Sequence, residues 1–208
     1  LKQAAALPFT SAMWSLGYRL IHGDKLTEDL VEGERWLWRA VKRGSAGAAQ
    51  ELASLLFNGD KLKADVGLAE RLLRREAEAK NGEAMTELGR RLLMGDKLSQ
   101  DLLEGEKWLR RGAEAGTRYA MSQLGRWLLE GQFLKEDVVE GAAWLRKSAA
   151  AGELEDVKLL VQLLIDGGKL KQDLVEATQW MLRLAAAGDL DAMSWLGRQL
   201  LGGNGPKI

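Results

Sequence analysis

Apolar residues recur along this chain at the spacing of one helical face, and the pattern returns every 36 residues. Two leucine columns stand four residues apart, and a column of small residues stands four before the first. The columns are Leu16, Leu52, Leu88, Leu124, Leu160 and Leu196, then Leu20, Leu56, Leu92, Leu128, Leu164 and Leu200, with Ala12, Ala48, Ala84, Ala120 and Ala192 before them. Such i, i+4, i+8 spacing predicts a helix, here called helix A, that buries one face. A fixed period of this length is typical of stacked repeats.

A second helix, helix B, follows helix A in every repeat. Helix A ends at a glycine, as helices often do, and a Gly-Asp-Lys-Leu turn or a variant of it follows, for example at residues 95–98. Helix B then begins after an aspartate such as Asp101, and in four of five repeats a glutamate such as Glu104 stands three residues later. This spacing predicts a capping box. A tryptophan column is predicted to pack helix B on helix A: Trp36, Trp108, Trp144 and Trp180.

The columns divide the chain into one repeat domain over residues 1–208, with five full repeats and a half-repeat at each end. Residues 1–7 align with the tail of a helix B, and residues 189–201 align with a helix A. Neither end carries the polar cap that repeat arrays usually need for solubility. We therefore expect either more chain beyond these ends or self-association through them.

Composition narrows the class of protein. Lysine plus arginine and aspartate plus glutamate both count 30, so the net charge is zero, which argues against a nucleic-acid partner. The chain has no cysteine, and charge interrupts every apolar run well short of a membrane span. It begins at Leu1, without a signal peptide pattern, so we expect a processed piece of a longer protein.

The repeated motif resembles the Sel-1-like repeat family, which is related to tetratricopeptide arrays. The motif is clearest at residues 84–92, 95–101 and 104–116, and the resemblance covers essentially the whole chain. It implies an all-α, right-handed superhelical solenoid of antiparallel helix pairs. It also implies an adaptor or scaffold of bacterial type, in the cytoplasm or periplasm, that binds proteins on its concave face. Two departures from the pattern are Lys80, where glycine ends other repeats, and Asp156, where alanine is expected.

No residue set predicts catalysis or a cofactor. His22 is the only histidine, and neither a second metal ligand nor a serine partner stands at a recognisable spacing. The Gly-Asp-Lys-Leu turns lack the Gly-Lys-Ser/Thr ending of a phosphate loop. Basic residues late in helix B are expected to complement the helix dipole on a solvated face. We predict no metal site.

Helix A columns that differ between repeats are the candidate partner-binding residues. They supply Tyr18, Arg90, Arg91, Arg126 and Arg198. Arginines 90, 91 and 126 have a second interpretation, because each has a glutamate, Glu87 or Glu130, within helical pairing distance.

Four apolar residues are expected to meet on the same face: Trp127, Leu159, Leu163 and Trp195. An aromatic and leucine cluster rimmed by arginine has the composition of an interface hot spot. The alternatives are that further chain covers the cluster or that tryptophan folds down into the groove.

The sequence thus predicts a non-catalytic scaffold that binds another protein in its groove, such as a component of an assembly complex. A narrower version is a bacterial immunity protein that neutralises a toxin or effector. The rival class is a carbohydrate-binding or enzymatic module in which Trp127 and Trp195 stack on a substrate.

Overall fold

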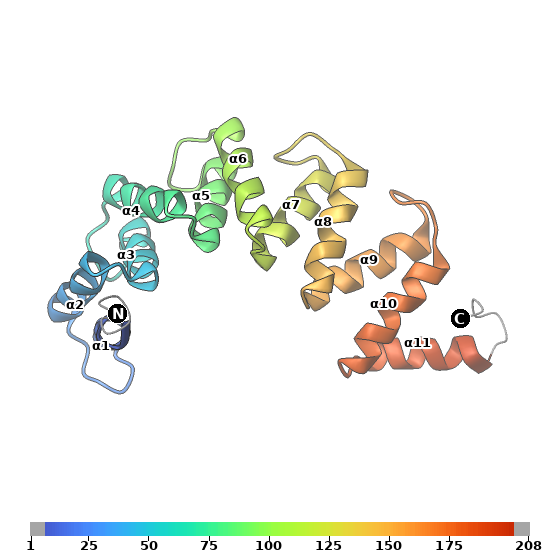
Figure 1. Cartoon of the computed structure of the whole chain (residues 1–208), viewed down its shortest axis with the longest axis horizontal. Helices are drawn as coiled ribbons and strands as arrows, with labels where there is room; N and C mark the ends of the chain where they lie inside the picture. Colours follow the sequence, from blue (N-terminus) through green and yellow to red (C-terminus); the bar gives the residue numbers. More distant parts are fainter. Residues whose placement is uncertain (1–6, 202–208) are drawn as a thin grey trace. The chain divides into compact units, whose positions relative to one another are not determined.

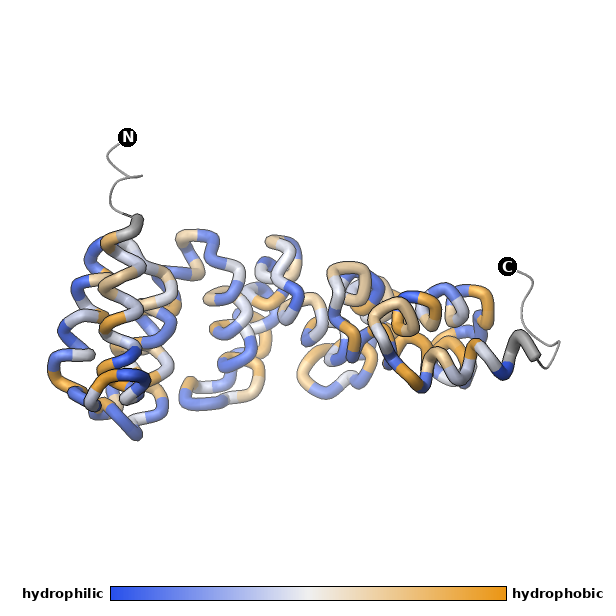
Figure 2. The backbone as a smooth tube through the Cα atoms, turned by 90° about the horizontal axis from the view of Figure 1, so that it is seen from below, coloured by the Kyte–Doolittle hydropathy of each residue, from blue (hydrophilic) through white to orange (hydrophobic). Residues whose placement is uncertain are grey.

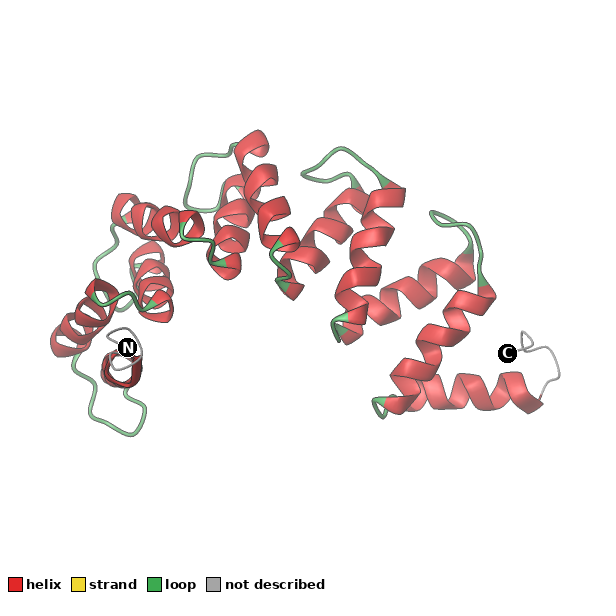
Figure 3. Cartoon of the chain, in the orientation of Figure 1, coloured by secondary structure: helices red, strands yellow, loops and turns green. Residues whose placement is uncertain are grey.

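The computed structural model describes residues 7–201, all of whose regular structure is helical (Figures 1 and 3). The helices are α1 (Leu7–His22), α2 (Leu30–Lys42), α3 (Ala46–Asn58), α4 (Val66–Glu78), α5 (Gly82–Met94), α6 (Leu102–Glu114), α7 (Arg118–Glu130), α8 (Val138–Ala150), α9 (Leu154–Asp166), α10 (Leu174–Ala186) and α11 (Leu190–Leu201). Odd-numbered helices are the predicted helices A, and even-numbered ones are the predicted helices B. The predicted all-α array of 36-residue helix pairs is confirmed.

Aspartates begin every helix B, as the sequence predicts. In α6 the Asp101 side chain accepts a hydrogen bond from the Glu104 backbone N–H at 2.9 Å, and the other four helices B repeat this contact. The reciprocal half of the capping box is wrong, because the Asp101 backbone N–H donates to the Leu92 carbonyl of the preceding helix A at 3.0 Å. The glutamate carboxylate is left to accept from the Trp108 indole N–H, at 3.1 Å.

Paired glycines let the two helices of a repeat cross at close range. A side chain at Gly89 would place its Cβ 2.7 Å from the Leu109 backbone nitrogen, and one at Gly105 would lie 2.7 Å from the Leu93 side chain. Cβ atoms do not approach neighbours so closely without a shift of the neighbour. The α5–α6 pair therefore depends on both glycines for its spacing.

The helices form two compact units, residues 1–115 and 116–208. The core of the first is made by the leucine and alanine columns of its helices and includes Phe57 and Trp108. The core of the second is built from the same columns and includes Leu160, Leu164 and Trp180. In Figure 2, hydrophobic and hydrophilic stretches alternate along the helices, as one-sided burial requires.

The division into five full repeats and a half-repeat at each end stays a prediction. At the C-terminal end, α11 is the expected helix A after the last full repeat. The helix B tail predicted for residues 1–7 lies outside the described residues, apart from Leu7 in α1. A single domain over 1–208 stays a prediction.

Candidate functional site

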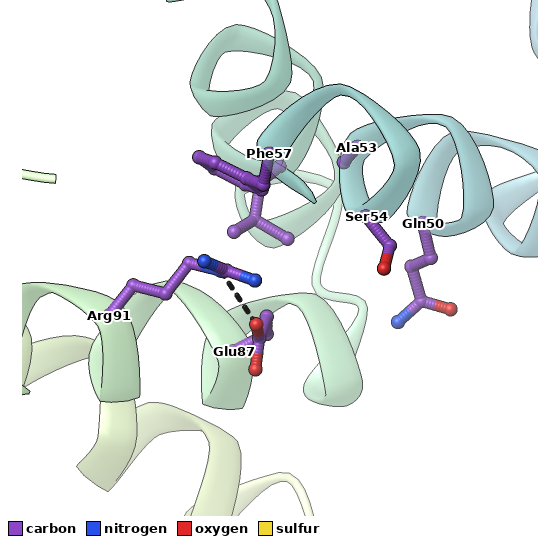
Figure 4. A pocket seen from close by; sticks show the side chains of 7 residues that line it. Gln50, Ala53, Ser54, Phe57, Glu87 and Arg91 are labelled. Carbon is purple, nitrogen blue, oxygen red and sulfur yellow. Dashed lines mark ion pairs between the residues drawn. The ribbon is translucent and has the colours of Figure 1, made fainter. Parts of the chain in front are cut away.

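A pocket of about 150 Å³ opens between α3 and α5 in the first unit (Figure 4). Its floor is apolar, and each floor residue is only 2% exposed: Ala53, Phe57 and Leu73. Polar and apolar atoms share the accessible lining. The half-buried Gln50, the exposed Ser54 and the Glu87 side chain, which is 34% exposed, supply its polar groups. Gln50 and Ser54 come from α3, and Glu87 faces them from α5.

The α5 wall of the pocket is a neutral ion-pair network, in which the buried Arg91 Nε makes no hydrogen bond to the described residues although it lies close to Glu87. Glu87 lies 2.6 Å from Arg91 Nε and 3.0 Å from Arg90 Nε, and Asp96 Oδ2 lies 3.1 Å from Arg91 Nη1 and 3.4 Å from Arg90 Nη2. The Arg91 guanidinium also covers the Phe57 ring, 4.0 Å from its centroid. The predicted alternative, pairing of both arginines with Glu87, is confirmed. Arg91 is buried, so it acts as a fixed wall of the pocket.

A second pocket, of about 180 Å³, lies at the corresponding place in the second unit, among α9, α10 and α11. Four of its lining residues hold the same repeat positions as Gln50, Ala53, Ser54 and Leu73 of the first pocket. They are Lys158, Val161, Gln162 and Met181. The fold therefore forms the same kind of pocket between successive helices A at two places. The lining residues differ, so the two pockets differ in chemistry.

Between α7 and α9, an ion pair occupies the place that corresponds to these pockets. Asp156 is fully buried at the start of α9, and its Oδ1 accepts from Arg126 Nε at 3.0 Å and Nη2 at 2.7 Å. The Ser122 hydroxyl donates to the same oxygen at 3.0 Å. Asp156 Oδ2 has no hydrogen-bond partner among the described residues. Arg126 thus pairs with Asp156, and the predicted alternative partner, Glu130, is wrong.

The prediction of an accessible apolar cluster is wrong for Trp127, its main residue. Trp127 is 6% exposed, and its ring packs edge-on against Phe133 of its own repeat, with centroids 5.0 Å apart. Leu159 and Leu163 are half-buried and pack on the core of the second unit. Trp195 is half-buried. The alternative prediction, that the tryptophan folds down into the groove, therefore holds for Trp127. Burying the large apolar ring is more favourable than leaving it in water.

The outer predicted residues remain accessible. Arg198 is exposed, and Tyr18 is 40% exposed with its ring 4.3 Å from that of His22. The His22 imidazole lies 2.7 Å from Glu51 of α3, so its contacts link two repeats. Whether the predicted residues bind a partner stays a prediction.

Two accessible residues of this face were missed from the sequence, Gln50 and Trp14, the latter 39% exposed one turn before Tyr18. Both belong to one helix A column that differs between repeats. That column reads Trp14, Gln50, Thr86, Ser122 and Lys158. Its variability was the available signal.

The opposite face, made by the helices B, is covered by structural contacts. The Arg74 guanidinium of α4 bonds the Glu104 carboxylate of α6, with Nη2 to Oε2 at 2.9 Å, and this hydrogen bond is the main cause of a lowered Glu104 pKa. Arg146 does the same to Glu176 and lowers its pKa. Basic residues near the ends of the helices B lie over tryptophan rings. The Arg111 guanidinium, for example, lies 4.5 Å from the Trp108 ring centroid. The two arginine–glutamate pairs hold successive repeats together, whereas Arg111 covers a ring of its own helix.

A family model for the Sel1 repeat matches residues 10–45, 46–81, 82–117, 118–153 and 163–189. The chain belongs to the Sel1 repeat family, whose members are helical repeat scaffolds that commonly mediate protein–protein interaction. A comparison with curated proteins finds none that matches.

Solved structures support the same fold. A protective antigen from uropathogenic Escherichia coli with this fold is 26% identical, with a TM-score of 0.76 over 97% of this chain and 43% of that one. A Sel1 repeat protein from Oxalobacter formigenes is 24% identical, with a TM-score of 0.73 over 98% of this chain and 86% of that one. The immunity protein Pa5087 from Pseudomonas aeruginosa is 18% identical, with a TM-score of 0.56 over 89% of this chain and 68% of that one. The present chain thus spans less than half the length of the E. coli protein.

Residues 7–201 lack two further features. No helix there has the length and apolar character needed to cross a membrane. No three histidine, aspartate or glutamate side chains there gather into a group suited to a metal ion.

Proposed function

We propose that this protein is a non-catalytic scaffold that binds a protein partner through the face made by its helices A. The observation that carries the proposal is the pair of pockets at one repeat position, one lined by Gln50 and Ser54 and the other by Lys158 and Gln162. At such a position the backbone is the same in every repeat but the side chain differs. The position therefore offers a partner a different contact in each repeat. Stacked helices also hold these side chains in place, so little ordering entropy is lost on binding.

The helix B face supports this assignment by contrast. Its charged residues already pair between repeats, as Arg74 and Glu104 do, or lie over tryptophan rings. A partner there would have to break contacts that stabilise the array. On the helix A face, Gln50 and Ser54 have no hydrogen-bond partner among the described residues and are accessible.

Substitutions already found in other repeats provide the test. Arginine stands at the Ser54 and Gln162 positions in the third and fourth repeats, as Arg90 and Arg126, so Ser54→Arg and Gln162→Arg should fold. Each would place a long side chain across a pocket mouth. We expect the doubly substituted protein to lose most partner capture in a quantitative affinity pull-down from cells of the source organism. Gln179→Arg, at an exposed position of α10, is the matched control.

The result that would overturn the proposal is the reverse pattern. Capture that survives the two pocket substitutions and is lost with Gln179→Arg would place the partner on the helix B face.

A second candidate function is neutralisation of a toxin, as an immunity protein. The supporting observation is the fold likeness to Pa5087, which at 18% identity speaks for the fold alone. Co-expression with candidate toxins, scored by rescue of growth, would separate this function from assembly scaffolding. The carbohydrate alternative loses support because Trp127, one of its two stacking residues, is buried.

A further inference from the structure

The pocket between α3 and α5 differs from an ordinary apolar binding pocket in what it exposes. Ala53, Phe57 and Leu73 form its floor, yet each is 98% covered, and Arg91 lies over the Phe57 ring. An apolar side chain entering here would cover little of the floor, which is already buried, and would leave the polar groups of Gln50 and Ser54 without hydrogen-bond partners. The pocket therefore selects its occupant by polar contacts.

Charge balance excludes a second class of occupant. Two arginines and two acids, Glu87 and Asp96, neutralise one another in the wall. An incoming carboxylate would have to compete with Glu87 for Arg91, and an incoming ammonium or guanidinium would have to compete with Arg91 for Glu87. Either charge would lose hydration without gaining a free counter-ion, which is a costly exchange.

The remaining hydrogen-bonding capacity matches a primary amide. The Gln50 carboxamide offers one acceptor oxygen and two N–H donors, and the Ser54 hydroxyl offers one donor and an acceptor. Both side chains have no hydrogen-bond partner among the described residues, and they stand one helical turn apart on α3. A second carboxamide can pair with Gln50 through one N–H···O bond in each direction. Its other N–H can donate to Glu87, and its carbonyl oxygen can also accept from Ser54.

Volume limits the occupant to one side chain. A pocket of about 150 Å³ holds about five waters at roughly 30 Å³ each. This is room for the end of a single glutamine or asparagine, which would displace those waters and replace their hydrogen bonds.

We propose that the pocket formed by Gln50, Ser54, Glu87 and Arg91 binds the carboxamide side chain of a glutamine or asparagine presented by the partner protein. This inference rests on the proposed function and specifies which chemistry the first unit recognises. The second pocket, with Lys158, Asp189 and Asp191 in its lining, has a charged rim and is expected to select differently.

The test uses short peptides of one host sequence, acetyl-Gly-Gly-X-Gly-Gly-N-methylamide, with X as Gln, Glu, Lys or Leu, titrated against the ¹⁵N-labelled protein by NMR. The N-methyl group leaves the X side chain as the only possible primary amide. We expect the Gln peptide to bind at least threefold more tightly than the other three, with shifts at Ser54, Glu87 and the Gln50 side-chain amide. Gln50→Leu should abolish that preference and Ser54→Ala should reduce it. Gln179→Leu is the control for loss of an amide at an exposed helical site. Circular dichroism verifies that all variants remain helical.

Each other outcome has a defined meaning. Tighter binding of the Glu, Lys or Leu peptide at these residues would overturn the amide assignment and leave the helix A face as the binding face. An equal affinity of all four peptides at these residues, or a Gln preference unchanged by Gln50→Leu, would also overturn it. Shifts confined to the helices B would contradict the proposed function as well.

Discussion

The buried ion pair between Arg126 and Asp156 gives a sharp prediction about stability. Asp156 is completely covered, and both of its charge-assisted hydrogen bonds come from Arg126, with one more bond from Ser122. Replacing Arg126 with alanine leaves a buried carboxylate without a cation. Removing one partner of such a pair costs about 3–5 kcal/mol. Because the Arg126 side chain is 34% exposed, water reaches the site when it is removed, and we expect the lower end, about 3 kcal/mol.

Replacing Asp156 has a very different expected outcome. Alanine occupies this position in the other repeats, as Ala48, Ala84 and Ala120 show, so the α9 backbone accepts it. Asp156→Ala also removes an oxygen that has no partner, and replacing a buried pair with apolar residues is often neutral. We expect a change within about 1 kcal/mol of zero. The double substitution should resemble Asp156→Ala alone, which gives a coupling energy of about 2–3 kcal/mol.

Urea unfolding followed by circular dichroism measures these values. With a slope of about 1–3 kcal/mol/M, Arg126→Ala should lower the midpoint of the affected transition by about 1–3 M. Arg90→Ala is the matched control, since Arg90 holds the same repeat position but pairs with Glu87, which is partly exposed and keeps Arg91. The control should cost about 1 kcal/mol or less. An Arg126→Ala protein as stable as the wild type, or a double variant as unstable as Arg126→Ala, would refute the reasoning.

Three further predictions follow from contacts described above. Glu104→Gln should cost about 1 kcal/mol at pH 7 through the weakened Arg74 contact. Because folding lowers the Glu104 pKa from its ordinary 4.5, this contribution is present above pH 4.5 and disappears as the pH falls through the lowered pKa. The two proteins should therefore converge in stability as urea titrations are carried to acid pH, and a constant difference would contradict the sign. Gly89→Ala should destabilise the α5–α6 pair by about 1–3 kcal/mol, because the alanine Cβ would meet the Leu109 backbone. Thermal melts measure this loss, and an unchanged melt would show that the two helices can move apart without cost. Lys80→Gly should stabilise by about 1 kcal/mol, because Lys80 has φ of 67°, and a loss of stability would mean that the lysine side chain matters more than the backbone.

The array itself was predictable from the sequence because its determinants are local. Asp101 caps α6, glycines end the helices A, and the leucine columns are buried in α3, α5, α7 and α9, each because a residue type suits one backbone position. The capping box was half wrong for a reason the sequence does not display. The amide of each capping aspartate finds a carbonyl on the preceding helix A, and only the folded pair shows that contact.

The site was less predictable because it depends on contacts between repeats. Arg126 was placed correctly on the variable face, but its partner lies 30 residues away in the next repeat, and a search for helical neighbours cannot find it. Trp127 was on the predicted helix face, yet its ring turns inward onto Phe133. Gln50 belonged to a column that the prediction left out, although that column changes in every repeat.

The first pocket draws its lining from two successive repeats, and this has a consequence for how such proteins diversify. Gln50 and Ser54 come from residues 46–81, whereas Glu87 and Arg91 come from residues 82–117. Duplication of residues 46–81 in tandem would set Gln50 and Ser54 of the first copy opposite Glu51 and Leu55 of the second. One recombination event would thus keep the original pocket and add a new one with a different lining, without any point mutation. Under the proposed function, specificity would be a property of the junctions between repeats, and reordering repeats would be enough to generate new recognition surfaces.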